Sequence, residues 1–150
     1  MILLDTNVVS ELMRSKPDPG VKMWLAKQDT ANVFISVITE AELRYGVAIL
    51  PMGRRRDQIA AEVENMLKED FARRILPFDS KASPIYAEIG AGRRAAGLPI
   101  SHADCQIAAI ARCRGAAIAT RNVGHFEHCG IEVINPWTAL TGLQSESTET

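Results

Sequence analysis

Carboxylate and amide side chains stand at points of this sequence where an apolar run ends or a helical segment begins. Asp5 closes the apolar run of residues 1–4, and Asn122 follows that of residues 116–119. Glu42 and Asp104 each lie near the start of a helical segment. Three carboxylates gathered in a partly dry cleft would repel one another at a cost of the order of several kcal/mol. A divalent cation removes that cost, and Mg²⁺ and Mn²⁺ prefer such oxygen ligands.

The same residues also suit helix capping. Thr39-x-x-Glu42 and Ser101-x-x-Asp104 both fit the capping box, in which an acid answers the unpaired amides of a first helical turn. Asp5 can likewise serve as an N-cap. Capping explains any one of these residues as well as catalysis does, but it does not explain why a carboxylate directly closes an apolar run.

Strand-like and helical segments alternate along the chain. Strands are expected at residues 2–4, 33–36, 74–78, 116–119 and 132–134, and helices at 8–13, 21–27, 38–50, 54–71, 80–96 and 101–114. This alternation predicts an α/β protein with three α/β/α layers and a central, mainly parallel sheet. Ligands of such sheets bind beyond the carboxyl ends of the strands, which is where the acids fall.

The length of 150 residues suits one domain, expected over residues 1–140, followed by a flexible polar tail at residues 141–150. No apolar run approaches the ~18 residues of a membrane span, and the N-terminus lacks the pattern of a signal peptide, so we expect a cytoplasmic protein. The three cysteines show no metal-ligand spacing. A net charge of −1 disfavours nucleic-acid binding by bulk charge, although arginines cluster at residues 54–56 and elsewhere.

Five short motifs, taken in order, resemble those of the PIN-domain ribonucleases, and most closely the VapC and FitB toxins of bacterial toxin–antitoxin pairs. The motifs are Leu4–Asn7, Glu40–Gly46, Leu76–Asp79, His102–Ala109 and Ala119–Asn122, followed by Asn135-Pro136-Trp137. The resemblance runs from residue 1 to about residue 138. It implies a PIN-like fold and a Mg²⁺-dependent (or Mn²⁺-dependent) ribonuclease that hydrolyses phosphodiester bonds in single-stranded or looped RNA.

Carried over position by position, the resemblance assigns Asp5, Glu42 and Asp104 as catalytic, metal-binding acids and leaves Glu40 as a surface or helix-start residue. Family members commonly have a fourth acid where this chain has Asn122. An amide oxygen can still coordinate Mg²⁺, but it brings no negative charge. We therefore expect a second ion to bind more weakly, or only with substrate present.

Around these acids, Thr6 and Thr120 are candidate hydroxyl partners for metal-bound water or for orienting the ligands, with capping or strand-end roles as the alternative. Arg121 and Arg44 are the cations nearest the acids in sequence and are expected to position RNA. His125 is a candidate for contact with substrate or metal, or else a plain loop residue. A histidine mechanism that uses the RNA's own 2′-hydroxyl is the rival chemistry.

The resemblance also implies a homodimer and a cognate antitoxin of the VapB or FitA kind, whose tail enters the toxin's cleft and through which alone DNA is bound. The alternative function, of a different class, is a PIN domain that binds antitoxin or RNA without cutting it. The amide of Asn122, where family members commonly have an acid, is the feature that favours this alternative. A haloacid-dehalogenase-like phosphatase is disfavoured because it needs an acid where Asn7 stands. The phosphate-binding motif G-x-x-x-x-G-K-[ST] does not occur in the sequence.

Overall fold

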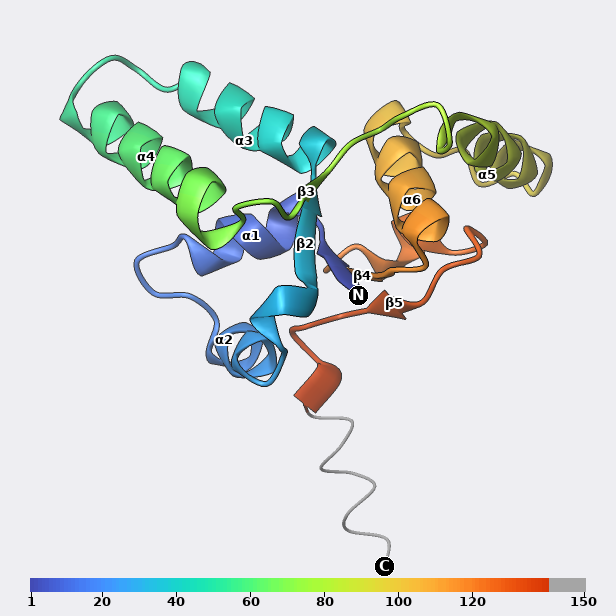
Figure 1. Cartoon of the computed structure of the whole chain (residues 1–150), viewed down its shortest axis with the longest axis horizontal. Helices are drawn as coiled ribbons and strands as arrows, with labels where there is room; N and C mark the ends of the chain where they lie inside the picture. The colour runs from blue at the N-terminus through green and yellow to red at the C-terminus, as the bar shows by residue number, and fades with distance from the viewer. Residues whose placement is uncertain (141–150) are drawn as a thin grey trace, which may run out of the picture.

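The computed structural model describes residues 1–140. Within them, five strands form one parallel sheet in the order β3-β2-β1-β4-β5 (Figure 1). The strands are β1 (Ile2–Leu4), β2 (Val33–Ser36), β3 (Ile75–Leu76), β4 (Ala117–Ala119) and β5 (Val133–Ile134). The predicted fold class is confirmed, whereas the predicted flexible tail at residues 141–150 lies outside the described residues.

Helices cover both faces of this sheet. Figure 1 shows α5 and α6 on one side of the strands and α1, α2 and α4 on the other. The helices are α1 (Thr6–Leu12), α2 (Pro19–Ala26), α3 (Val37–Ala48), α4 (Arg54–Asn65), α5 (Ser83–Ala95) and α6 (His102–Arg114). Among residues 1–140, none of them is long and apolar enough to cross a membrane.

Strand β1 occupies the centre of the sheet because its side chains are apolar on both faces. Leu3 packs into the core under α5 and α6, and Leu4 packs into the core under α1, α2 and α4. Both are fully buried, and burying a leucine side chain contributes roughly 1.5–3 kcal/mol. Ile118 and Ala119 of β4 divide between the two cores in the same way. The two strands whose ends carry Asp5 and Thr120 are therefore held in a fixed register.

The N-caps of α3 and α6 are serines and not the candidate acids on these helices. Ser36 Oγ accepts from the Thr39 N–H at 3.1 Å and caps α3, so the predicted Thr39-x-x-Glu42 box is wrong and the helix begins earlier than expected. Ser101 Oγ accepts from the Asp104 N–H at 3.1 Å and caps α6. The Glu42 side chain is thus not needed at a helix start, whereas Asp5 does cap α1.

Among the predicted segments that are shorter in the structure, two strands have a clear local reason. The strand expected at residues 74–78 ends at Leu76, because Pro77 has no N–H to continue the ladder. The strand expected from Ala116 begins at Ala117, because the Ala116 N–H returns to the Ala111 carbonyl at 2.8 Å and closes helix α6. This closure places Gly115 in the left-handed region, with φ of 66°.

Two glycines allow a test of this helix ending. Gly115→Ala is expected to lower the free energy of unfolding by about 1 kcal/mol, because alanine is strained at positive φ. Gly92→Ala, inside α5 with open space around its added Cβ, is expected to raise it by roughly 0.5–1 kcal/mol. Urea unfolding of both variants measures the difference, and two changes of the same sign would contradict this account.

Candidate active site

A cleft of about 630 Å³ opens at the carboxyl edge of the sheet. Asp5, Glu42, Asp104 and Asn122 all line it, although more than a hundred residues separate the first from the last. Asp5 leaves β1, Asn122 follows β4, and the other two project from α3 and α6. The cleft lies where the chain order on the two sides of β1 diverges, the usual place for a ligand in a parallel sheet.

Asp5 is the most firmly held of these carboxylates, with 6% of its surface exposed. Its Oδ1 accepts from the Thr6 N–H at 2.8 Å, and its Oδ2 accepts from the buried Thr120 hydroxyl at 2.8 Å. Asn7 Nδ2 lies 3.3 Å from Asp5 Oδ2 and 3.2 Å from Thr120 Oγ1. These donors fix the carboxylate in one orientation toward the cleft.

Glu42 is tied to the same strand end through Thr6. The Thr6 hydroxyl donates to Glu42 Oε1 at 3.0 Å and also lies 3.0 Å from the hydroxyl of buried Thr39. One threonine therefore serves two acids, with its backbone N–H on Asp5 and its side chain on Glu42. The first and second candidate acids are coupled by a single residue.

Asp104 meets His125 across the cleft. His125 Nδ1 lies 3.1 Å from Asp104 Oδ2. His125 belongs to a 3-10 turn (Val123–Phe126) that follows Asn122, and it also lines the cleft. His125 thus lies in the cleft wall beside Asp104, and its expected contact with substrate or metal stays a prediction.

Negative charge accumulates in this cleft. Burial raises the pKa of Asp5 above its ordinary value, with a further rise from the charge of Asp104 and an opposing effect of the bonds from Thr120 and Thr6. Partial burial raises the pKa of Glu42, and the charges of Asp5 and Asp104 add to that rise. Ionising all three acids is therefore costly unless a cation shares the site.

The donors present suit a hard cation. Carboxylate, hydroxyl and amide oxygens line the cleft, and none of the cysteines does. Within residues 1–140, no three Asp, Glu, His or Cys side chains already form a metal cage. Mg²⁺ keeps several of its waters and commonly uses one or two protein carboxylates, so such a cage is not required. The residues fit this ion.

Most of the predicted site residues meet in or beneath the cleft. Thr6 and Arg121 line it, and Thr120 lies under it with its hydroxyl on Asp5. Arg44 lies outside the lining and forms ion pairs with Glu64 at 2.7 Å and Glu40 at 3.5 Å, so its expected role in positioning RNA stays a prediction.

Two features of the cleft were not expected from the sequence. Asn7 and Ser10 of α1 and Arg14, just beyond its end, contribute to the wall of the cleft, and their spacing of three and four residues was the available signal. Trp137, in the turn after β5, also lines the cleft, and the Arg121 guanidinium lies 5.1 Å from the centroid of its ring.

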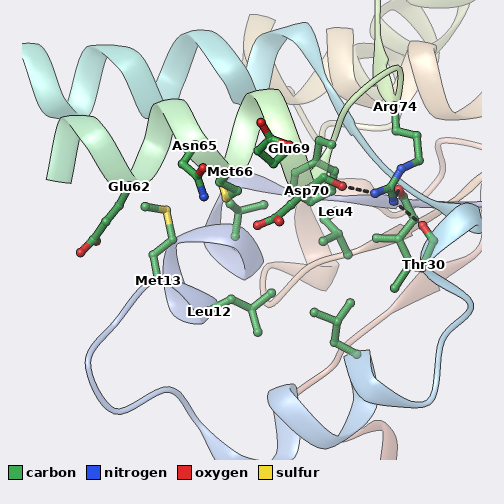
Figure 2. A pocket seen from close by; sticks show the side chains of 14 residues that line it. Leu4, Leu12, Met13, Thr30, Glu62, Asn65, Met66, Glu69, Asp70 and Arg74 are labelled. Carbon is green, nitrogen blue, oxygen red and sulfur yellow. Dashed lines mark hydrogen bonds between the residues drawn. The ribbon is translucent and has the colours of Figure 1, made fainter. Parts of the chain in front are cut away.

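A second hollow of about 640 Å³ lies beside α1 and the end of α4 and contains none of the three candidate acids (Figure 2). Arg74 closes one end of it by donating to the backbone carbonyls of Thr30 and Asp70. Because its lining is apolar and acidic, this hollow suits an apolar segment that also carries basic side chains. The apolar lining includes Leu4, Leu12, Met13 and Met66, and the acidic lining consists of Glu62, Glu69 and Asp70.

Comparison with known proteins agrees with the motifs. The PIN domain family model matches residues 2–130. The chain is 43% identical over 137 residues to the VapC ribonuclease Y4jK of Sinorhizobium fredii, covering 91% of this chain and 98% of the relative. It is 42% identical over 137 residues to toxin FitB of Neisseria gonorrhoeae, covering 91% of this chain and 99% of the relative.

A solved structure shows the same arrangement of elements. The structure of FitAB bound to the IR36 DNA fragment superposes with a TM-score of 0.87 at 42% identity, over 91% of this chain and 96% of that chain.

The charge in the cleft should limit the stability of the metal-free protein. Because the pKa of Glu42 is raised on folding, its ionisation favours the unfolded state as the pH rises through the folded-state pKa. Glu42→Gln is therefore expected to raise the melting temperature in EDTA at about pH 8, with a gain that shrinks toward about pH 4.

Glu40→Gln is the matched control on the same helix. It removes only a surface ion pair with Arg44, so it should leave stability unchanged or slightly lower. A Glu42→Gln protein no more stable than the Glu40→Gln protein at about pH 8 would refute the charge argument.

Proposed function

Because the chain belongs to the PIN-domain family, we propose that it is a ribonuclease and the toxin of a toxin–antitoxin pair. The observation that carries the proposal is the meeting of Asp5, Glu42 and Asp104, from three distant segments, in one open cleft. The names of the relatives, a ribonuclease and a toxin, support the same function.

We assign Asp5, Glu42 and Asp104 to holding Mg²⁺, with Mn²⁺ as a substitute and the Asn122 amide as a neutral oxygen beside them. A bound divalent ion supplies charge stabilisation at the phosphate and acidifies water. The protein orients the ligands: Thr120 and Thr6 hold Asp5, and the Thr6 hydroxyl holds Glu42. With three formal charges rather than four, a second ion binds more weakly.

The proposed substrate is single-stranded or looped RNA, hydrolysed by water. The cleft is open to solvent and offers Arg121 as a phosphate ligand. Asp104 and Glu42 are the carboxylates placed to accept the proton of an attacking water. Attack by water that displaces the 3′-oxygen leaves a 5′-phosphate on one product and a 3′-hydroxyl on the other. Attack by the RNA's own 2′-hydroxyl displaces the 5′-oxygen and leaves a 2′,3′-cyclic phosphate and a 5′-hydroxyl.

The proposed partner is a cognate antitoxin of the VapB or FitA kind, in an assembly of homodimeric toxin that meets DNA only through the antitoxin. The solved FitAB structure, which is bound to a DNA fragment, supports this part of the proposal. The hollow of Figure 2 offers an apolar floor with Glu62, Glu69 and Asp70 on its walls, which suits an apolar segment that carries basic residues.

Removal of single carboxylates tests the nuclease. Asp5→Asn and Asp104→Asn are each expected to lower the rate of Mg²⁺-dependent RNA cleavage at least about 100-fold, because each removes a charged ligand of the ion. Glu40→Gln, an acid outside the cleft, should cleave like the unaltered protein. End-labelled single-stranded RNA measures both the rate and the chemistry of the product ends.

Cleavage that survives both substitutions, or that persists in EDTA, would overturn the metal-dependent mechanism. Cyclic phosphate ends that disappear in His125→Gln would favour the histidine mechanism instead. If the unaltered protein binds RNA or antitoxin but never cuts RNA, the chain is the alternative PIN domain that binds without cutting, as the missing fourth acid at Asn122 would favour.

Expression in bacteria tests the toxin assignment separately. The protein is expected to arrest growth, and co-expression of the product of a small neighbouring gene should relieve the arrest. Glu62→Lys with Glu69→Lys should weaken that relief while leaving RNA cleavage intact, because these exposed acids lie in the second hollow and not in the cleft. Full relief of the doubly charge-reversed toxin would contradict docking in this hollow.

A further inference from the structure

Trp137 reaches the cleft because β4 and β5 end side by side. Ala119 pairs with Ile134, and the Thr120 N–H donates to the Ile134 carbonyl at 2.9 Å. The segments that leave the two strands therefore run out together at the carboxyl edge. Asn135 Oδ1 accepts from the Trp137 N–H at 3.0 Å and fixes the turn that carries the indole.

The Trp137 ring packs against the protein core and is also in contact with the Arg121 guanidinium at the cleft. It is half-buried and packs against the core cluster that contains Leu4 and Val8. The exposed Arg121 guanidinium lies 5.1 Å from the ring centroid, within the range of a cation–π contact. The Arg121 backbone is tied separately, because its N–H donates to Asn7 Oδ1 at 3.3 Å.

This arrangement sets Arg121 apart from the other basic side chains of the cleft. Arg14 is paired with Glu11 at 3.1 Å, and His125 contacts Asp104 at 3.1 Å. None of the salt bridges within residues 1–140 includes Arg121. A carboxylate would hold a guanidinium by cancelling its charge, whereas an aromatic ring holds it and leaves the charge and all five N–H donors available.

We propose that Trp137 is a positioning residue that holds the Arg121 guanidinium at the cleft as the ligand of an RNA backbone phosphate. The inference rests on the proposed ribonuclease function and adds the residue that fixes the phosphate-binding arginine. Within residues 1–140 the Arg121 guanidinium lies over Trp137 and forms no salt bridge with Asp5 or Glu42, so it does not occupy the place of the cation among the acids. It offers its charge to the strand that lies across them.

The test measures binding of a single-stranded RNA oligonucleotide in an Asp104→Asn background without added divalent ion, in which cleavage is expected to be at least about 100-fold slower. Arg121→Gln should weaken binding roughly fivefold and reduce the slope of log Kd against log salt by about 0.7, the value for one phosphate contact on a single strand. Trp137→Leu should weaken binding in the same direction, by roughly threefold. The double variant should bind no worse than Arg121→Gln alone, because both changes remove one interaction.

Trp137→Phe separates positioning from packing. Phenylalanine keeps an aromatic face for the guanidinium and should retain most of the affinity and of the salt slope, whereas leucine keeps apolar volume without that face. In the protein with Asp104 intact, Trp137→Leu should raise KM for RNA more than it lowers kcat. Equal binding by the Leu and Phe variants, or additive losses in the double variant, would overturn the inference.

A second measurement covers the case in which Trp137→Leu does not fold. Trp24→Phe leaves Trp137 as the one tryptophan in the chain. RNA should then change its fluorescence, and Arg121→Gln should abolish most of that change. Fluorescence unaltered by saturating RNA overturns the role of Trp137 while metal-dependent cleavage still stands. Failure of the unaltered protein to cleave any RNA overturns the proposed function, and this inference falls with it.

Discussion

The repulsion among three carboxylates that the fold forces together is the constraint on which the rest of the site depends. Asp5 cannot move away, because it follows the central strand, whose leucines are buried in the cores on both faces of the sheet. Burial and neighbouring acids raise the pKa of Asp5 and that of Glu42. A positive charge bound between these carboxylates would therefore favour their ionised forms. A divalent cation does this best, because it carries two charges in a small volume.

Hydroxyl groups make this concentration of charge tolerable. Thr120 and Thr6 donate to the two oxygens of Asp5, and the Thr6 hydroxyl donates to one oxygen of Glu42, so these three oxygens have donors that carry no positive charge. Serines 36 and 101 cap the two helices that carry the other acids. Because these neutral groups do the capping and the orienting, Glu42 and Asp104 keep oxygen atoms free for the cleft.

The arginines in and near the cleft differ in the kind of side chain with which each is paired. Arg44 and Arg14 are paired with glutamates, while the Arg121 guanidinium lies over the Trp137 indole. A guanidinium without a carboxylate partner keeps its full electrostatic attraction for a polyanion. The chain has a net charge of −1, so attraction of RNA would depend on such local placement and not on the field of the whole protein.

The sequence by itself determined the alternation of strands and helices, and with it the parallel sheet and the edge at which Asp5 and Asn122 would lie, because apolar runs and helical spacing are local properties of the chain. The resemblance of five motifs then selected Glu42 over Glu40. Only the tertiary structure decided what caps α3, that Arg44 pairs with Glu64, and that Thr6 joins two acids. It also placed Trp137 beside Arg121. Each of these depends on contacts between segments distant in the chain, chiefly the register of β4 against β5 and the packing of α3 against α1 and α4. Periodicity along one segment contains no information about such contacts.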